Sequence, residues 1–460
     1  MYPIVIDPVI EYNGQAGGMY TVYIDSTNPN TNYRNDYLRA GVYTNMSGPP
    51  EYATLVKPDT LVPQKSSDTI IGAKLNLKVC AYGGNEWYLG AYRITSDWNE
   101  ATVTWNNMDA SHATHMSNDL QSYISSIATG SYGALDRTEA YKSWYKKDSQ
   151  GNHTNYGIAV RRACAATYNC AQFYSSRYPD GGNPYISVNY VSHAGRKSWW
   201  KYESMDTGRA GSVYADIYNG NSIAEHADTV TAGNRMPASI SHIYNSCLSD
   251  EDEAYCALGW RLNVNQYVRR AIIMSQRYYI WKDGDGTEHY FEVNGDGPYS
   301  DCEGMQLKLS LTSNWVLIKD KNDTQMRFPL MTGYEKVYLD GIQDAQGNTM
   351  FLTYDANHPG MVTKVKDGID RETVLSYNSN GLLASITAPG CPVVSYTYSG
   401  NSTTGYLLTR INYSDLNTSQ YTEYGYDTYG GQQFTATLVS MKNYDGVETR
   451  IGYDTDLDTT

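Results

Sequence analysis

The chain has 460 residues and a formal net charge of −14 at pH 7, and its Lys and Arg residues form no cluster. This balance argues against nucleic acid or an anionic lipid surface as a partner, because both require a basic patch. No run of about 18 apolar residues is present, so we expect no membrane span. Tyr occurs 45 times and Phe only 5 times, which favours strands with half-exposed aromatic positions.

The N-terminal part of the chain alternates apolar and polar residues. We expect residues 1–10 to be the tail of a preceding segment, because MYPIVIDPVI has the composition of a strand in mid-fold. Residues 11–192 are predicted to form one all-β domain, since stretches such as AKLNLKVCAY show the period-2 pattern of half-buried strands. YRITSDWNEATVTWNNM is expected to continue this pattern, and a linker at 193–202 follows. The chain is expected to be a piece of a longer protein.

One helix is expected inside this domain, in the stretch LDRTEAYKSWYKKDSQG. Asp136 is predicted to cap its N-terminus, with Glu139 as the capping-box partner. Ala140, Tyr141, Trp144 and Tyr145 then form one apolar i, i+4 stripe, which we expect to face the core.

The second half of the chain is predicted to be strand-rich and then repetitive. Residues 203–330 contain a hairpin pattern, in which two aromatic-rich strands flank Asp-Gly-Asp-Gly at 283–286. Residues 331–460 repeat a pair of Tyr followed by Asp or Asn. The pairs begin at Tyr354, Tyr377, Tyr426 and Tyr453. Repeats of this length indicate a stacked architecture in which each unit buries its face against its neighbours.

The stretch YNSNGLLASITAPGCPVVSYTYSGN, residues 377–401, is the clearest copy of the repeat. It predicts a β-hairpin with one apolar and one polar face, and Gly381 and Gly390 supply the turn conformations. Three residues of its first strand are expected to share one face: Leu382, Ala384 and Ile386. A phosphate-binding loop is excluded, because no helix pattern follows either glycine.

Several of these stretches resemble the YD repeats of Rhs-repeat proteins, namely LDGIQDAQGNTMFLTYD, YNSNGLLASITAPG and YDTYGG. GNRMPASISHIYNS resembles the strands that precede such repeats. The resemblance covers about 203–460 and implies opening strands at 203–330 and YD repeats at 331–460, which together form part of an Rhs-type shell. In this family the shell often encloses a C-terminal toxin or effector domain, the polymorphic-toxin arrangement. That domain would be a partner within the full-length protein. The sequence departs from the pattern because it holds few repeats and no recognisable toxin domain.

The first domain resembles the DNRLRE domain through DSTNPNTNYRNDYLRAG, IIGAKLNLKV, YRITSDWNEATVTWNN and NPYISVNY. This resemblance covers most of 11–192. It implies a jelly-roll β-sandwich of bacterial surface and secreted proteins, akin to carbohydrate-binding domains. A cell-surface glycan or protein is the expected partner, and the location is expected to be extracellular or at the cell surface.

Aromatic residues are the candidate binding residues in this domain. Trp87 and Tyr88 are expected to lie in a Gly-rich loop and are proposed to bind carbohydrate, because an aromatic ring face matches the apolar face of a pyranose. Trp98 and Trp105 are expected to pack in the core instead, as large aromatic residues usually do.

No catalytic, cofactor or metal-binding residue is assigned. The Asp-Gly-Asp-Gly stretch is interpreted as a hairpin turn and not as a calcium loop, because Thr287 stands where a ligand is needed. His112 and His115 form an H-x-x-H pair without a third ligand nearby in sequence. Two cysteine pairs are spaced to close small loops: Cys164 with Cys170, and Cys247 with Cys256.

These observations predict a non-enzymatic bacterial surface or secreted protein, with a binding module followed by a partial β-shell. Two alternatives stay open. One is a carbohydrate-binding adhesin without a toxin. The other is a glycoside-active enzyme with an appended binding domain, for which Asp97, Glu100 and Asp109 are the candidate acids.

Overall fold

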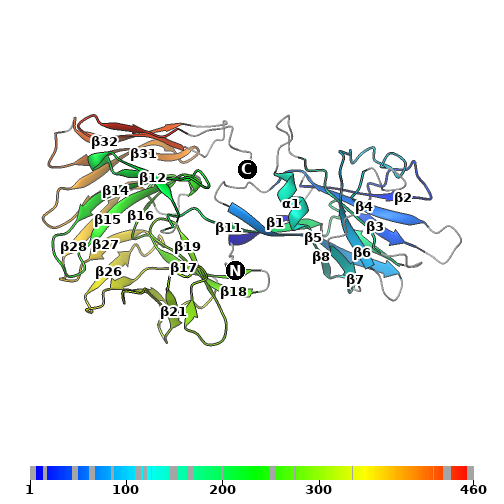
Figure 1. Ribbon diagram of the computed structural model, residues 1–460, viewed down its shortest axis with the longest axis horizontal. Helices are drawn as coiled ribbons and strands as arrows, with labels where there is room; N and C mark the ends of the chain where they lie inside the picture. The colour runs from blue at the N-terminus through cyan, green and yellow to red at the C-terminus, as the bar shows by residue number, and fades with distance from the viewer. Residues whose placement is uncertain are drawn as a thin grey trace. The chain divides into compact units, whose positions relative to one another are not determined.

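The expectation of an all-β fold is confirmed, since strands predominate and helices are few. The computed structural model describes residues 7–13, 18–43, 50–61, 68–83, 88–108, 115–117, 122–125, 127–145, 154–163, 169–197, 200–248, 255–273, 276–333, 335–417, 419–427 and 437–452. The chain divides into two compact units (Figure 1). The N-terminal unit comprises Ile6–Gln64 and Ile70–Val191, and the C-terminal unit comprises Ser192–Thr455.

The described residues of the N-terminal unit include eleven strands that form one continuous sheet. The strands are β1 (Asp7–Asn13), β2 (Met19–Asp25), β3 (Tyr37–Val42), β4 (Glu51–Pro58), β5 (Asp68–Gly83), β6 (Tyr88–Arg93), β7 (Ser122–Ser125), β8 (Tyr132–Asp136), β9 (Ile158–Arg162), β10 (Asn169–Tyr174) and β11 (Tyr185–Ser192). The order across the sheet is β1-β11-β5-β10-β3-β4-β9-β6-β7, while β2 pairs with β4 and β8 pairs with β5. Strands distant in sequence are therefore neighbours, and the order could not be read from local patterns.

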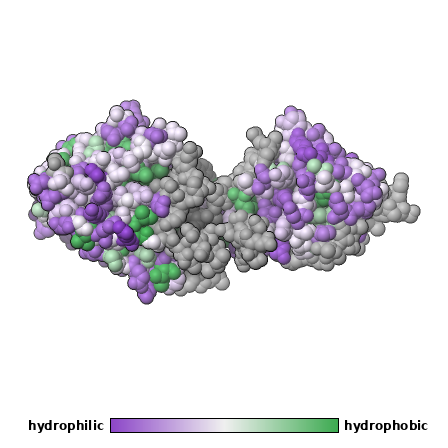
Figure 2. Space-filling model, turned by 90° about the horizontal axis from the view of Figure 1, so that it is seen from above, coloured by the Kyte–Doolittle hydropathy of each residue, from purple (hydrophilic) through white to green (hydrophobic). Residues whose placement is uncertain are grey.

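Alternation along the strands builds the core of this unit. In β5, Leu75, Leu77 and Val79 are fully buried, whereas Lys74 and Lys78 on the other face are half-buried. The inward residues of the other strands join the same apolar cluster. On the side seen from above, the described surface of this unit is mainly hydrophilic (Figure 2). The period-2 pattern thus places apolar side chains inside and polar ones outside, as expected.

The predicted helix is present as α1 (Thr138–Trp144). Three residues of the predicted stripe are buried in the core: Ala140, Tyr141 and Trp144. The fourth, Tyr145, is the C-cap of the helix and is half-buried against the same core. Its start differs from the expectation, because Arg137 occupies the N-cap position and makes no capping side-chain hydrogen bond. Glu139 pairs with Lys142 at 3.1 Å, as an i, i+3 ion pair.

Two segments near the expected domain boundaries have a definite local structure. Residues 7–10 belong to β1, which pairs with β11. Two residues of the expected linker 193–202 are buried. Ala194 is 3% exposed, and the side chain of Lys197 is also 3% exposed. The Lys197 ammonium forms an ion pair with Glu303 of the C-terminal unit. The domain boundaries drawn from the sequence stay a prediction.

Where the structure describes it, the C-terminal unit forms three antiparallel sheets. The five-stranded sheet has β12 (Tyr202–Asp206), β13 (Ser212–Asp216), β14 (Ser222–Val230), β15 (Ser239–Asn245) and β16 (Trp260–Leu262). The four-stranded sheet has β17 (Tyr267–Ile273), β18 (Gln276–Lys282), β19 (Glu288–Glu292) and β24 (Val337–Tyr338). We call the fourteen-stranded sheet the ribbon. Its strands are β20 (Tyr299–Ser300), β21 (Lys308–Leu311), β22 (Trp315–Lys319), β23 (Gln325–Pro329), β25 (Gly341–Gln343), β26 (Thr349–Tyr354), β27 (Val362–Lys366), β28 (Glu372–Tyr377), β29 (Leu383–Thr387), β30 (Val394–Asn401), β31 (Gly405–Tyr413), β32 (Tyr421–Asp427), β33 (Thr437–Lys442) and β34 (Glu448–Arg450).

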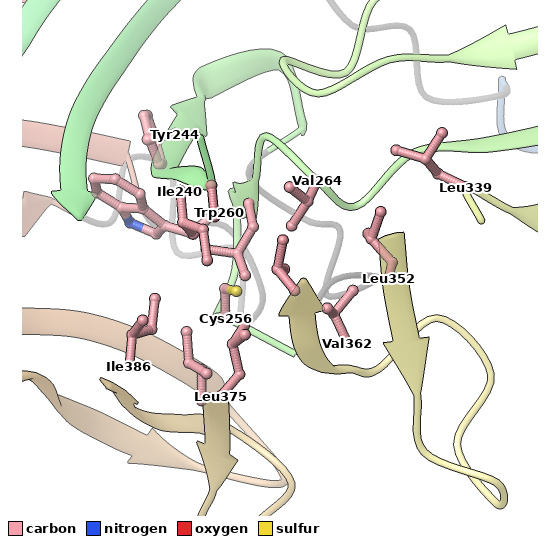
Figure 3. Close-up of a cluster of buried hydrophobic side chains, with 14 of the residues drawn as sticks. Ile240, Tyr244, Cys256, Trp260, Val264, Leu339, Leu352, Val362, Leu375 and Ile386 are labelled. Carbon is pink, nitrogen blue, oxygen red and sulfur yellow. The ribbon is translucent and has the colours of Figure 1, made fainter. Parts of the chain in front are cut away.

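The apolar face of the ribbon packs against the five-stranded sheet. Figure 3 shows Tyr244 and Trp260 on one side of this packed layer and Leu375 and Ile386 of the ribbon on the other. All four side chains are at most 3% exposed and belong to one apolar cluster. The sequence did not indicate what each hairpin face contacts, and here the apolar face is packed inside the unit.

A tyrosine marks the same position in four hairpins of the ribbon. In each case the strand register shifts at or beside this tyrosine, which is the sign of a β-bulge. The tyrosine hydroxyl donates a hydrogen bond to a backbone carbonyl in the preceding strand or in the residues just before that strand. The pairs are Tyr354 to Leu339 at 2.6 Å, Tyr377 to Val362 at 2.7 Å, Tyr398 to Leu383 at 2.6 Å and Tyr426 to Leu408 at 2.6 Å. The Tyr pairs of the sequence therefore mark a repeated structural bond. Tyr398 is an additional copy, and Tyr453 lies outside the described residues.

Hairpin turns of this unit also share one geometry. Asp344 accepts hydrogen bonds from the backbone N–H groups of Gln346 and Asn348, each at 2.9 Å. Its own N–H donates to the carbonyl of Asn348 at 3.0 Å, and Gly347 has a φ of +87°. The same bonds recur in 283–287, 320–324, 367–371, 378–382 and 443–447. The hairpin interpretation of Asp-Gly-Asp-Gly and the positive φ expected at Gly381 are both confirmed.

One detail of the 377–401 hairpin differs from the expectation. The register passes from Ser376 opposite Ser385 to Tyr377 opposite Leu383, so Ala384 is the extra residue of a β-bulge. Leu383 and Ile386 are both fully buried. The expected face of Leu382, Ala384 and Ile386 is wrong, because a bulge breaks strict alternation.

Replacing Tyr377 by Phe is expected to lower the free energy of unfolding of the C-terminal unit by about 0.5–1.5 kcal/mol. The ring stays in place, but the Val362 carbonyl loses the hydroxyl that donates to it at 2.7 Å. Urea unfolding followed by tryptophan fluorescence measures the change. Tyr218→Phe is the matched control, since Tyr218 is 71% exposed. Equal stabilities of the two variants would contradict the role given to the repeated tyrosine.

Candidate functional site

Exposed aromatic residues are the first candidates for a binding surface. Trp87 lies outside the described residues, so its position stays a prediction. Tyr88 begins β6 and is 37% exposed. Its ring lies 5.7 Å from that of Tyr123 on β7, which is 59% exposed. Tyr88 therefore belongs to a pair of exposed rings on adjacent strands. Sequence reasoning missed Tyr123, because the pairing of β6 with β7 joins residues far apart in the chain.

Trp98 and Trp105 are core residues, as predicted. They are 7% and 6% exposed and share one apolar cluster with Val22 and Leu55. The Trp98 indole N–H donates to the carbonyl of Tyr156 at 2.8 Å. The segment between the two tryptophans forms turns and not the predicted strand. Both side chains consequently point inward, and neither is available for a ligand.

The candidate acids of the glycosidase alternative are engaged by cations. Glu100 forms ion pairs with Arg34 at 3.0 Å and with Arg177, and it accepts the Thr21 backbone N–H at 2.7 Å. Asp97 forms an ion pair with Lys57 at 2.9 Å. Glu100 thus ties three segments of the N-terminal unit together. The third candidate, Asp109, lies outside the described residues.

The possible metal ligands of the sequence do not form a site within the described ranges. His115 is hydrogen-bonded through Nδ1 to the Ser96 hydroxyl at 2.5 Å, and His112 lies outside the described residues. In the part of the chain that the structure describes, no three His, Cys, Asp or Glu side chains are grouped to hold a metal ion. The described residues also include no helix long and apolar enough to cross a membrane.

The Asp-Gly-Asp-Gly turn carries a half-buried pair of carboxyl groups, those of Asp283 and Asp285. His289 Nε2 lies 2.9 Å from Asp283 Oδ2. Desolvation, together with the nearby carboxylate of Asp283, raises the pKa of Asp285 above its ordinary value. Thr287 donates both its backbone N–H and its hydroxyl to Asp285. These hydrogen bonds stabilise the hairpin turn between β18 and β19.

The cysteines of the two expected loops lie in different surroundings. Cys164 lies outside the described residues, so its pairing with Cys170 stays a prediction. Cys247 packs in a small cluster with Ala194 and Leu248. Cys256 belongs to the large apolar cluster of the C-terminal unit.

A buried cluster of polar side chains lies where the five-stranded sheet meets the ribbon. We call His226, Asp228 and His242 the histidine–aspartate cluster. His226 and Asp228 alternate on β14, and His242 is the partner of His226 on β15. The Asp228 carboxylate accepts hydrogen bonds from His242 Nδ1 at 2.6 Å and His226 Nδ1 at 3.1 Å. His226 Nε2 is hydrogen-bonded to the hydroxyl of Tyr413 in the ribbon, and the Tyr396 ring lies 4.7 Å from that of His242.

The electrostatics of this cluster favour an ionised carboxylate. Burial alone would raise the pKa of Asp228, but attraction to His242 and hydrogen bonds from both imidazoles lower it to about 2. The three side chains are at most 1% exposed. The cluster therefore links the sheet to the ribbon and is closed to substrate. Sequence reasoning missed it, although His226 and Asp228 stand two residues apart on an alternating strand.

Comparison with known proteins gives a partial similarity. No family model matches the chain. The tRNA nuclease WapA of Bacillus subtilis strain 168 is 24% identical over 163 residues, as is the tRNA(Glu)-specific nuclease WapA of Bacillus subtilis subsp. natto. The tRNA3(Ser)-specific nuclease WapA of Bacillus spizizenii is 25% identical over 163 residues. Each match covers 35% of this chain and 6% of the relative, so the chain spans a small part of these relatives' length.

This comparison corrects one expectation from the sequence. The chain was expected to belong to a non-enzymatic protein, but the three relatives are named as enzymes that act on tRNA. The expectation arose because the 460 residues carry no recognisable catalytic motif, and a short segment of a long protein need not carry one.

Proposed function

We propose that this chain is part of a secreted or cell-surface bacterial protein of the Rhs-repeat type, and that the complete protein is a nuclease toxin acting on tRNA. The observation that carries the proposal is the ribbon, in which a tyrosine-marked hairpin recurs along fourteen paired strands. The similarity to the WapA nucleases supports the same type of protein. The nuclease activity is assigned to the complete protein.

In this proposal the ribbon contributes part of a wall around the toxin. Each hairpin pairs with the preceding one, and the apolar face joins residues of the five-stranded and four-stranded sheets in one apolar cluster. Such a ribbon grows by adding hairpins, because each new hairpin needs only its neighbour to satisfy its backbone hydrogen bonds. The repeated bond from tyrosine to carbonyl then holds each hairpin to the one before it.

The N-terminal unit supplies attachment to a target surface in the same proposal. Its all-β architecture and the exposed Tyr88 and Tyr123 support a binding role. The DNRLRE resemblance points the same way. The expectation that these 460 residues bind no nucleic acid stays a prediction that follows from their net charge of −14.

The test is cleavage of tRNA by the protein encoded by the complete reading frame. The purified protein is incubated with total bacterial tRNA, before and after limited proteolysis to open an enclosing shell, and fragments are separated on a denaturing gel. We expect discrete tRNA fragments, with 5S ribosomal RNA left intact as the control substrate. The 460-residue chain is assayed beside it, which locates the activity. Intact tRNA under every condition would overturn the proposal.

A further inference from the structure

A row of aromatic side chains with one lysine crosses the outer face of the N-terminal sheet. We call it the tyrosine–lysine row: Tyr37, Tyr174, Lys78, Tyr132 and Tyr185. Tyr37 and Tyr174 are directly opposite each other on β3 and β10. Lys78 and Tyr132 are directly opposite on β5 and β8. Because β5 pairs with both β10 and β11, the row is continuous across the sheet.

Distances within the row show that its members touch. The ring centroids of Tyr37 and Tyr174 are 5.9 Å apart, and those of Tyr132 and Tyr185 are 5.3 Å apart. The Lys78 ammonium lies between the two ring pairs, 5.7 Å from the Tyr174 centroid and 6.0 Å from the Tyr132 centroid. This is the geometry of a cation held by two aromatic faces.

The row points away from the core. Tyr37 and Tyr132 are 42% and 40% exposed, and Lys78 is half-buried. The residues next to the row in each strand are buried on the opposite face: Leu38, Phe173, Val79, Gly133 and Ile186. The row is therefore a surface feature and not part of the apolar core.

The loop after β10 positions the lysine and one ring. Gly182 has a φ of +90° and approaches so closely that a Cβ there would lie 2.7 Å from Lys78 Cδ and 3.2 Å from Tyr174 Cδ2. Tyr178 of the same loop lies 4.2 Å from the Tyr174 ring and 5.6 Å from the Tyr37 ring, centroid to centroid. The side chains are thus held in place before any ligand arrives, which lowers the entropy cost of binding.

The charge on this face differs from that of the whole chain. Among the described side chains, the outward positions of β3, β5, β8, β10 and β11 carry the cations Arg39, Lys74 and Lys78 and the carboxylate of Asp136, which is opposite Lys74. Asp180, in the loop after β10, lies near Tyr178. The chain as a whole has a net charge of −14. Within the described residues, Lys78 has two ring faces and no carboxylate partner. A cation so placed is complementary to an anionic group on a ligand.

We propose that the tyrosine–lysine row binds an acidic polysaccharide whose sugars carry carboxylates. This deepens, and rests on, the attachment role proposed for the N-terminal unit. The tyrosine rings stack on the apolar faces of consecutive sugars. The Lys78 ammonium pairs with a carboxylate between the stacked sugars, and Gln172, at a half-buried outward position of β10, supplies an amide group for a sugar hydroxyl.

Calorimetric titration of the full 460-residue chain with polygalacturonate oligomers tests this proposal. Neutral galactan oligomers and polyglutamate of matched length are the comparison ligands. Lys78→Met removes the charge but keeps much of the aliphatic stem, and Tyr174→Ala removes one ring. Tyr218→Ala is the matched control, because Tyr218 is 71% exposed and belongs to the C-terminal unit. Circular dichroism of each variant checks that the fold is kept.

We expect polygalacturonate to bind and the neutral galactan to bind at least roughly tenfold more weakly. Lys78→Met and Tyr174→Ala should each weaken polygalacturonate binding roughly tenfold, and Tyr218→Ala should leave it unchanged. Polyglutamate binding as tightly as polygalacturonate would show attraction to charge alone and would overturn the proposal. No binding of polygalacturonate, or binding insensitive to Lys78→Met, would also overturn it. If polygalacturonate does not bind but the complete protein still cleaves tRNA, the binding proposal alone has failed and the proposed function stands.

Discussion

Asp228→Asn is expected to lower the free energy of unfolding of the C-terminal unit by about 3–5 kcal/mol at neutral pH. The wild-type carboxylate accepts hydrogen bonds from two buried imidazoles, at 2.6 and 3.1 Å. An amide places an N–H₂ group where one acceptor oxygen stood, so one histidine faces a donor in a site closed to water. Hydrogen–deuterium exchange, read by peptide, measures the effect. Peptides from 200–248 and 394–417 should lose protection, while peptides of the N-terminal unit serve as internal controls.

We also expect the stability difference between wild type and Asp228→Asn to depend on pH. The pKa of Asp228 is about 2 in the folded protein, below the ordinary value of about 3.9 for an unfolded Asp. A lowered pKa stabilises the fold above the unfolded pKa, and this stabilisation is lost as the pH falls from about 4 through about 2. The contribution is about 2–3 kcal/mol. The stability difference between wild type and Asp228→Asn should therefore narrow over this range.

The control for both measurements is Asp296→Asn, since Asp296 is an exposed acid of the same unit. It should change the stability by less than about 0.5 kcal/mol. A difference between wild type and Asp228→Asn that stays constant from pH 7 to pH 2 would contradict the ionised state given to Asp228. Equal stability of wild type and both variants would contradict the linking role of the histidine–aspartate cluster.

Trp260→Ala is expected to cost about 3–5 kcal/mol of unfolding free energy, through the lost apolar contacts and the cavity left behind. Trp260 is 2% exposed and lies at the centre of the packed layer between the five-stranded sheet and the ribbon (Figure 3). Its ring is 4.9 Å from that of Tyr424 and 5.4 Å from that of Tyr244. Its indole N–H donates to the Tyr426 hydroxyl at 2.7 Å.

Urea unfolding separates the two contributions of Trp260. Trp260→Phe keeps an aromatic ring but loses the indole N–H, so it should cost clearly less than Trp260→Ala. Tyr218→Ala is the surface control, because Tyr218 is 71% exposed, and it should stay within about 0.5 kcal/mol of wild type. If Trp260→Ala were no more destabilised than Tyr218→Ala, the ribbon would not depend on the five-stranded sheet for its packing.

Local features were predictable because they depend on neighbouring residues. The alternation in β5 and the turn at Asp283 follow from the side-chain period of a strand and from the hydrogen-bonding reach of an Asp side chain. The β-bulge at Ala384 was missed, since the residues around it alternate as though the strand were regular. The inward position of Trp98 and Trp105 was predicted from size alone, whereas the turns that produce it were not.

The binding surface and the buried cluster depend on contacts between distant parts of the chain. Lys78 meets Tyr174 and Tyr132 only because β5 pairs with both β10 and β8. Likewise, His226 reaches Tyr413 across 187 residues of sequence.

Composition and pattern alone therefore established an all-β chain with tyrosine-marked hairpins, because strand period and turn chemistry act over a few residues. Tertiary structure decided which tyrosines are buried hydrogen-bond donors, as Tyr377 is, and which lie on the surface, as Tyr37 and Tyr132 do. The physical reason is that one tyrosine side chain suits both environments, so the strand order and the sheet that covers each face make the choice.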